Sequence, residues 1–405
     1  MPARPAERTS SPARMASSTP PVSAAHIPAL DGLRGCAVLA VLMLHFADAL
    51  PEPSGAAGRV LKHAFHFGWA GVDLFFVLSG FLITGILADT RDRADRYRSF
   101  YARRALRILP LYFGFVALLF AVPWLAGARA YATPVEQQLP YWLFLQNLSP
   151  LRTEAIRFCA HLWSLAIEEQ FYLVWPLVIF FLSPARALRV CCVLMAGALV
   201  YRVAGVLMAD DLRSVYFQTP GRIDGLAVGG ALALMIRGAR EGRGLAALRR
   251  RAPLAGVLAL CVIAGAAATP AGFNPAGPYM LVAGYSALAL LFGAVLVMAV
   301  APEGWGGVRL LETGGLRFLG RYSYGLYMLH VPVIAAAYLA GVSPARFRGT
   351  AWELPAMFGF VSMLMAASVL AAMASFHLYE QPFLRLRSRY PRPREAEETR
   401  AMTAP

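Results

Sequence analysis

Apolar runs long enough to cross a lipid bilayer recur along this chain of 405 residues, with short arginine-rich blocks between them. A helix needs roughly 20 predominantly apolar residues to span the hydrocarbon core of a membrane. Charged residues make up only 15% of the chain, whereas soluble domains average about a quarter. The pattern therefore predicts an all-α, polytopic integral membrane protein rather than a series of soluble domains.

The hydropathy pattern predicts about ten transmembrane helices. Their ranges are 36–50, 67–88, 108–126, 168–183, 187–208, 221–237, 253–269, 280–300, 323–341 and 354–378. We expect one transmembrane domain over residues 27–384. A disordered cytoplasmic tail, rich in Pro, Ala, Ser and Arg, is expected over 1–26, and a basic cytoplasmic tail over 385–405. We expect no cleavable signal peptide before the first apolar run.

The distribution of arginines predicts how the chain is oriented. A net charge of +15 could indicate a nucleic-acid partner, but the arginines lie in short blocks between apolar runs. The blocks at 91–107, 237–251 and 385–400 are rich in arginine, and the alternate loops are poorer. The positive-inside rule therefore places both termini in the cytoplasm of a multi-pass protein of the plasma (inner) membrane. We expect the bilayer as a partner and no nucleic acid.

The first predicted helix carries two ionisable side chains, Arg34 and His45, at either end of an apolar run. Their separation is almost three helical turns, so both side chains lie on one face, roughly 16 Å apart along the axis. Ionisable groups inside a bilayer are costly and usually mark a water-filled site or a pathway. The alternative is an arginine that sets orientation and a histidine that hydrogen-bonds a neighbouring helix.

A second group of cations lies where the third predicted helix begins. Arg104 and Arg107 are three residues apart, so they are neighbours on a helix and offer two guanidinium forks to phosphate oxygens. Arg103 leaves the register of this pair open. The pattern predicts a bound phosphorylated ligand, with ordinary contact to lipid headgroups as the alternative.

A polar stripe is predicted at the start of the fourth helix. Its members follow at three- and four-residue steps: His161, Ser164, Glu168 and Tyr172. Glu169 points about 100° away from that stripe. A carboxylate at the mouth of an apolar helix could orient an imidazole, hold its charge or bind sugar hydroxyls, or it could cap the helix.

Further polar and aromatic residues are candidates for acceptor binding or structural support. They are Asp73, His161, Trp163, Glu169, Arg222, Asp224 and His330. Asp73 lies near a helix start, where the helix dipole favours an acid, and Arg222 and Asp224 could pair. Tyr327 and His330 are one helical turn apart, although aromatic residues at such positions often serve packing. The five cysteines show neither metal-ligand spacing nor a disulfide framework, so we expect no metal ion and no permanently bound cofactor.

Several of these segments resemble the acyltransferase-3 family of membrane O-acyltransferases. The matching motifs, in chain order, are Leu30–Gly35 followed by His45, Phe75–Phe81, Arg103–Pro110, Trp163–Tyr172, Tyr322–Tyr327 and Ser375–Pro382. Six motifs in sequence over about residues 28–385, with the same number of spans, make the resemblance specific. Some family members carry an extra extracytoplasmic esterase-like domain, and this chain looks like the stand-alone form.

The resemblance implies transfer of an acyl group, usually acetyl, from acyl-coenzyme A (acyl-CoA) to a hydroxyl of a sugar or sugar-bearing molecule. It implies that Arg34 and His45 are the essential pair of the first helix. It also carries Arg104 and Arg107 over as the basic motif on the cytoplasmic side, and Glu168 as the acidic residue of the fourth-helix motif.

These observations combine into a predicted mechanism. His45 removes the proton from the acceptor hydroxyl as that hydroxyl attacks the thioester, and Glu168 holds the imidazole. Arg34, Arg104 and Arg107 bind the phosphates of the acyl-CoA co-substrate. The remaining candidates for binding acyl-CoA are Arg103, Ser79 and Tyr327, the last two as donors to the thioester oxyanion. A covalent acyl-enzyme on His45 or Ser79 is the alternative chemical route.

Two other classes of function also place charges inside a membrane. One is a secondary transporter or flippase for a lipid-linked sugar, and the other is a non-catalytic assembly factor. Neither the acceptor, the acyl chain length nor the oligomeric state follows from the sequence. Surface polysaccharide, lipopolysaccharide, a lipid-linked oligosaccharide and a glycosylated small molecule all fit as acceptors.

Overall fold

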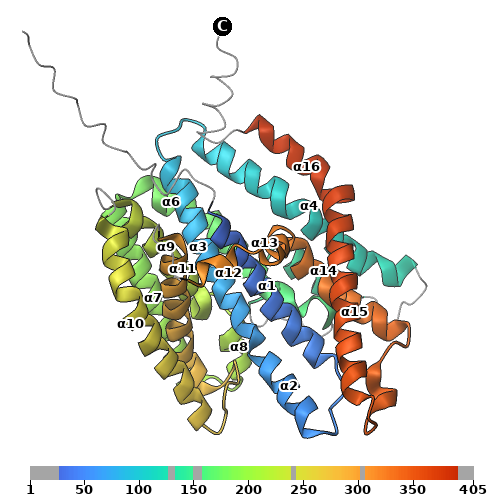
Figure 1. Ribbon diagram of the computed structural model, residues 1–405. Helices are drawn as coiled ribbons and strands as arrows, with labels where there is room; N and C mark the ends of the chain where they lie inside the picture. Colours follow the sequence, from blue (N-terminus) through green and yellow to red (C-terminus); the bar gives the residue numbers. More distant parts are fainter. Residues whose placement is uncertain (1–26, 126–132, 149–156, 239–242, 302–305, 391–405) are drawn as a thin grey trace, which may run out of the picture.

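The computed structural model describes residues 27–125, 133–148, 157–238, 243–301 and 306–390, and every regular element in these ranges is a helix (Figure 1). Eight helical stretches are long and apolar enough to cross a membrane. They are built on α1 (Pro28–Asp48), α3 (Gly71–Asp89), α4 (Arg96–Leu125), α6 (Trp163–Phe181), α7 (Pro184–Met208), α10 (Arg243–Gly265), α11 (Tyr285–Val300) and α15 (Glu353–Ala374). The predicted fold class, an all-α polytopic membrane protein, is confirmed.

The two other predicted spans are also helical. The α14 helix (Ser323–Leu339) is apolar but shorter than the eight, and α9 (Thr219–Gly238) carries two charged residues, Arg222 and Asp224, in its first turns. All ten predicted ranges therefore coincide with helices, although several helices begin earlier than expected. The α1 helix begins at Pro28 rather than at residue 36, and α4 begins at Arg96 rather than at residue 108. Hydropathy detects only the apolar part of a helix, so it missed the polar first turns.

Shorter elements connect these helices. They are α2 (Ala56–His66), η1 (Phe67–Ala70), α5 (Val135–Trp142), η3 (Arg157–Leu162), α8 (Leu212–Phe217), η5 (Ala266–Ala268), η6 (Met280–Gly284), α12 (Val308–Leu311), α13 (Gly314–Arg321), η7 (Pro344–Phe347), η8 (Ser375–Glu380), α16 (Gln381–Arg385) and η9 (Leu386–Arg389). Helix ends carry the expected signals: Pro28 occupies the first turn of α1, and the Ser183 side chain caps α7 by accepting from the Arg186 N–H.

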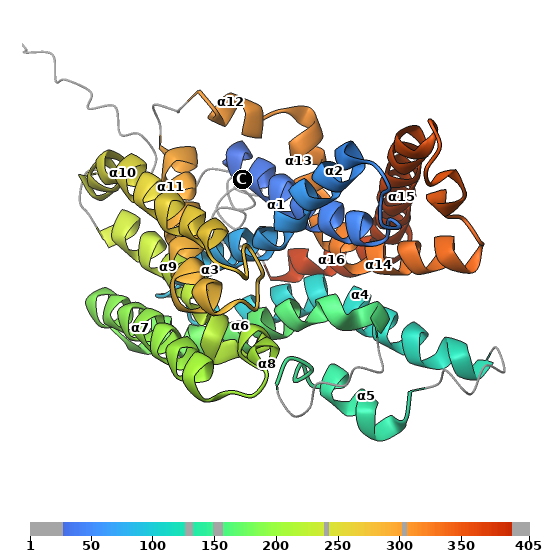
Figure 2. The same cartoon turned by 90° about the horizontal axis from the view of Figure 1, so that it is seen from below.

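The α1 and α3 helices lie near the middle of the bundle. Seen from below, α7, α9, α10 and α11 lie on one side of them and α14 and α15 on the other (Figure 2). The α3 and α9 helices pack backbone against backbone: a Cβ added at Gly80 would lie 2.0 Å from the Leu226 carbonyl oxygen, and one at Gly229 would lie 2.0 Å from that of Val77. Small residues permit this approach between helices in a membrane, where lipid gives little hydrophobic drive for association.

Close backbone contact at glycines also joins α1 to α13. A Cβ at Gly35 would lie 2.0 Å from the Leu316 carbonyl oxygen, and one at Gly320 would lie 1.9 Å from that of Asp31. The N-terminal half of α1, which carries Arg34, is therefore held tightly against α13. The α13 helix was not predicted as an element, because its eight residues alternate glycine and arginine with apolar side chains.

Candidate active site

A large cavity lies where the first half of α1 meets α13, the start of α14, and η8 and α16. Its volume is about 640 Å³, and five arginines line it: Arg34, Arg107, Arg317, Arg321 and Arg387. Asp31, Tyr322, Tyr324 and Glu380 supply other polar groups of the wall. Because Arg317 and Arg321 are exposed on α13, the cavity reaches the surface of the protein there. Such a concentration of guanidinium groups attracts a polyanion.

A second, narrower cavity of about 120 Å³ adjoins the first, because Arg34, Arg107 and Tyr324 line both. The narrow cavity brings together side chains from five helices: Ser79, Arg104, Ser164, Glu168, Tyr172 and Tyr327 are among those that line it. Most of the residues predicted to bind acyl-CoA therefore line these two neighbouring cavities. Arg103 does not line either cavity; its Nη1 donates to the Tyr390 carbonyl oxygen at 2.6 Å, whereas Arg104 and Arg107 face the narrow cavity.

A chain of hydrogen bonds forms one wall of the narrow cavity. The Tyr172 hydroxyl donates to Oε2 of Glu168 at 2.6 Å. Because that proton is used, the short hydrogen bond between Ser79 and Tyr172 has Ser79 as its donor. The Arg104 guanidinium carbon lies 4.5 Å from the centre of the Tyr172 ring, in a cation–π contact. The predicted polar stripe of α6 is thus present, and its carboxylate is held by Tyr172.

Arg34 reaches the two cavities from α1, and its Nη1 donates to Oδ1 of Asp31 one turn earlier at 3.2 Å. His45 lies three turns further along the same helix but does not line either of these two cavities, so the space that Arg34 faces stops short of it. The prediction of one helix that presents both side chains agrees with the structure. The open space expected between them is interrupted by residues of α6 and α14.

Tyr327 and Ser164 form that interruption. The Tyr327 hydroxyl donates to the His161 carbonyl oxygen at 2.5 Å and accepts from the Ser164 hydroxyl at 2.6 Å. Its proton is therefore used, and in this arrangement Tyr327 cannot donate to a thioester oxyanion. The ring of His161 packs edge-on to that of Tyr327, with ring centres 5.4 Å apart.

Three imidazoles meet behind Tyr327. Nδ1 of His45 lies 3.0 Å from the Val41 carbonyl oxygen and 3.1 Å from Nε2 of His330. The rings of His330 and His161 have centres 5.1 Å apart. His330 and His161 are buried, His45 is half-buried, and neither ring nitrogen of His161 has a hydrogen-bond partner among the described residues. These three do not make a metal centre, since the described part of the chain has no group of three or more His, Cys, Asp or Glu side chains placed to hold an ion.

Contrary to the expectation from the sequence, Glu168 does not hydrogen-bond His45. The Glu168 carboxylate contacts Tyr172, and the nearest ionisable neighbour of His45 is His330. Glu169 points away from the stripe as expected, and its buried Oε1 has no hydrogen-bond partner among the described residues.

A second buried polar group lies between α3, α7 and α9. Arg222 donates to Asp73 at 2.8 Å, and Arg202 pairs with Asp224 at 2.8 Å. Aromatic rings surround the Arg222 guanidinium, of which Tyr285 is the nearest at 3.8 Å and Trp163 lies at 5.4 Å. Arg222 and Asp224 therefore pair with other residues and not with each other.

Arg202 and the cavity arginines of α13 were missed by sequence reasoning. Arg202 is fully buried in the apolar α7 helix. The sequence does show an isolated arginine inside a predicted transmembrane span, and that arginine could have been recognised as a candidate site residue. Arg317 and Arg321 are four residues apart on an amphipathic helix, directly before the Tyr322–Tyr327 motif.

The fold and these cavities define a class: a helical membrane protein with an arginine-lined cavity and, separated from the cavities by Tyr327 and Ser164, a cluster of three imidazoles. The chain belongs to the acyltransferase-3 family, because the model of that family's acyltransferase domain, Acyl_transf_3, matches residues 27–376. No solved structure matches the chain.

Curated relatives carry more specific names. The chain is 30% identical over 395 residues to "Putative peptidoglycan O-acetyltransferase YrhL" of Bacillus subtilis, with 88% of this chain and 55% of that protein covered. It is 28% identical over 375 residues to the O-acetyltransferase OatA of Staphylococcus aureus, covering 88% and 57%. It is 29% identical over 327 residues to the peptidoglycan O-acetyltransferase OatA of Listeria monocytogenes, covering 76% and 49%. The chain thus spans about half the length of the curated relatives it matches.

Proposed function

We propose that this protein is a membrane-embedded O-acyltransferase that moves an acyl group, in the first instance acetyl, from acyl-CoA to a hydroxyl of a carbohydrate. The observation that carries the proposal is the pair of neighbouring cavities: a large one lined by five arginines lies beside a narrow one lined by Ser79, Glu168 and Tyr172. A donor with a polyphosphate head and a long thin arm fits such a space.

The large cavity is the proposed site of the CoA nucleotide. Its volume falls within the range of about 300–1,000 Å³ that is typical of small-molecule sites. The phosphates of CoA would meet guanidinium groups from α1, α4, α13 and η9, and arginine forks bind phosphate oxygens in pairs. The positive-inside rule predicts that this end of the bundle faces the cytoplasm, where acyl-CoA is made.

The narrow cavity is the proposed site of the pantetheine arm. That arm carries two amide groups, whose N–H donors need acceptors inside a membrane. The Ser79 hydroxyl donates its hydrogen to Tyr172, so its oxygen can still accept a hydrogen bond. Glu168 can accept through its second carboxylate oxygen. In this proposal Ser79 binds the arm of the donor, rather than the oxyanion.

The thioester then has to pass Tyr327. Breaking the hydrogen bond between Tyr327 and Ser164 costs about 1 kcal/mol of net stability, so donor binding can supply the energy for this opening. The acyl group would then reach the cluster of imidazoles. Tyr327 would become a donor to the oxyanion only when its hydroxyl also left the His161 carbonyl oxygen, which holds its proton.

His45 is the proposed general base. The acceptor oxygen attacks the thioester carbonyl carbon, its proton passes to the imidazole, the carbon–sulfur bond breaks, and the proton is returned to the CoA thiolate. His45 lies in the last turn of α1, at the end remote from Arg34, so a carbohydrate would approach it from the extracytoplasmic side. The names of the curated relatives make peptidoglycan fragments the first acceptors to test.

The test uses the full chain in lipid nanodiscs with acetyl-CoA labelled in the acetyl group. We expect release of free CoA to accelerate when a peptidoglycan fragment is added, and the label to appear on the fragment as an ester. Label that remains covalently bound to the protein would indicate an acyl-enzyme intermediate instead of direct transfer. Movement of a lipid-linked sugar across proteoliposomes without thioester cleavage would overturn the proposal in favour of a transporter.

A further inference from the structure

The hydrogen bonds around His45 define where its proton lies. A carbonyl oxygen only accepts, so the 3.0 Å contact between His45 Nδ1 and the Val41 carbonyl oxygen places a hydrogen on Nδ1. His330 makes the same contact four residues back, from its Nδ1 to the Leu326 carbonyl oxygen at 3.1 Å. A neutral His330 therefore carries its hydrogen on Nδ1 and a lone pair on Nε2.

These two assignments complete each other. Nε2 of His330 lies 3.1 Å from Nδ1 of His45, so the lone pair of one ring faces the N–H of the other. The His45 N–H is shared between the Val41 carbonyl oxygen and His330. The lone pair of His45 is then on Nε2, the nitrogen that neither neighbour uses.

We propose that His330 is a positioning residue that holds the proton of His45 on Nδ1 and so keeps the Nε2 lone pair available for the acceptor hydroxyl. This inference rests on the proposed role of His45 as the base. It assigns to a neutral imidazole the task that a carboxylate performs in hydrolase triads: to select the tautomer and to hold the N–H of the imidazolium that forms. Glu168, which contacts Tyr172 instead, is not needed for it.

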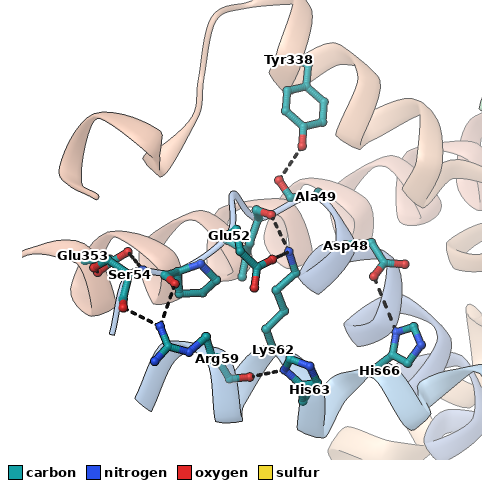
Figure 3. Close-up of polar contacts among 12 residues, drawn as sticks. Asp48, Ala49, Glu52, Ser54, Arg59, Lys62, His63, His66, Tyr338 and Glu353 are labelled. Carbon is teal, nitrogen blue, oxygen red and sulfur yellow. Dashed lines mark hydrogen bonds and ion pairs between the residues drawn. The ribbon is translucent and has the colours of Figure 1, made fainter. Parts of the chain in front are cut away.

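Contacts just after the end of α1 fix that end against the helix that carries His330 and against α15. Directly after α1, the Ala49 carbonyl oxygen accepts from the Tyr338 hydroxyl near the end of α14, the helix that carries His330 (Figure 3). In the same connection, Ser54 donates through its backbone N–H and its hydroxyl to Glu353 at the start of α15 (Figure 3). The end of α1 is thereby tied to the two helices packed beside it.

The experiment compares two substitutions of His330. In His330→Gln, an amide oxygen near the position of Nε2 can accept from His45; in His330→Leu, the Val41 carbonyl oxygen is the one remaining acceptor of the two described above. We expect the leucine variant to lower kcat about 10- to 100-fold, by analogy with the loss of a partner that orients a metal-ligating imidazole, with the KM for acetyl-CoA nearly unchanged. We expect the glutamine variant to recover most of that loss. Equal kcat values for wild type and leucine variant would overturn the proposal.

A spectroscopic readout separates this proposal from the proposed function. In protein labelled with ¹⁵N-histidine in nanodiscs, NMR distinguishes a protonated from a bare ring nitrogen, and His45→Gln identifies the His45 signals. We expect protonated Nδ1 and bare Nε2 in the wild type and in His330→Gln. In His330→Leu, where the Val41 carbonyl oxygen is left to hold the N–H without His330, we expect a measurable share of the tautomer with its hydrogen on Nε2. A wild-type His45 protonated on Nε2 would refute the inference, whether or not the protein transfers acyl groups.

His63 supplies the matched control. It is exposed on α2 and makes the same contact to a carbonyl oxygen four residues back, from Nδ1 to Arg59 at 2.8 Å. We expect His63→Gln to leave kcat and the signals of His45 unchanged. If the protein proves inactive toward every acceptor while His45 shows the expected tautomer and its loss in His330→Leu, the tautomer assignment stands and only the proposed reaction fails.

Discussion

The arginines of the large cavity are predicted to contribute unequally to donor binding. Arg107 is partly buried and lines both cavities, so a phosphate beside it is shielded from water. Arg321 is exposed on α13 at the mouth of the large cavity. If both bind the phosphates of CoA, Arg107→Ala and Arg321→Ala differ in magnitude and in their response to salt.

The two magnitudes follow from burial. A hydrogen bond to a charged group contributes about 1.5–3 kcal/mol, so Arg107→Ala should raise the Kd for CoA by about 10- to 150-fold. Exposed ion pairs contribute about 0.2–1 kcal/mol and are screened by salt. Arg321→Ala should therefore raise the Kd by less than about 5-fold at low salt, and this effect should vanish as the ionic strength approaches about 1 M.

Isothermal titration of CoA into nanodisc-embedded protein measures both variants. The control is Arg309→Ala, because Arg309 is exposed on α12 just before α13 and does not line either of the two cavities; its Kd should equal that of the wild type. Titration with dephospho-CoA, which lacks one phosphate, shows which arginine binds that phosphate. The alanine variant of that arginine should bind CoA and dephospho-CoA with equal affinity. A Kd for Arg107→Ala equal to that of the control would refute the assignment of the large cavity to the CoA nucleotide.

Three further predictions concern the narrow cavity and the packing around it. Tyr172→Phe should raise the KM for acetyl-CoA about 2- to 10-fold, because it frees Ser79 and Glu168 from their ordered chain; an unchanged KM contradicts the role of that chain. Asp73→Asn should lower stability by about 3 kcal/mol, because it leaves the Arg222 charge unpaired, and adding Arg222→Met should restore most of it; thermal unfolding in detergent that shows simple additivity contradicts this. Gly80→Val should prevent folding, since its Cβ would lie 2.0 Å from a carbonyl oxygen of α9, whereas Gly197→Val, with open space around it, should be tolerated; size-exclusion chromatography of both variants decides.

The sequence predicted what depends on local periodicity. Each of the ten apolar runs falls on a helix of the described residues, and the spacing of Arg34 and His45 correctly put both on one continuous helix, α1. The three-residue spacing of Arg104 and Arg107 likewise anticipated two cations that face one cavity. These features are properties of single helices, and the helix repeat alone dictates them.

The remainder depends on contacts between helices that are far apart in the chain. His45 and His330 are separated by 285 residues, and no periodicity relates them. Glu168 was expected to contact His45. Instead its carboxylate accepts a hydrogen bond from the hydroxyl of Tyr172, which lies one turn further along the same helix. The arginines of α13 escaped notice because an amphipathic helix that packs on protein rather than in lipid carries no hydropathy signal.

The central claim is that donor binding and proton removal take place at opposite ends of α1. The most direct test is to measure acetyl-CoA binding and thioester cleavage in His45→Gln and Arg107→Ala side by side. We predict that His45→Gln binds acetyl-CoA with wild-type affinity and cleaves none of it in the presence of acceptor, whereas Arg107→Ala loses affinity but recovers turnover at saturating donor. Wild-type turnover by His45→Gln, or loss of donor binding in that variant, would contradict the account.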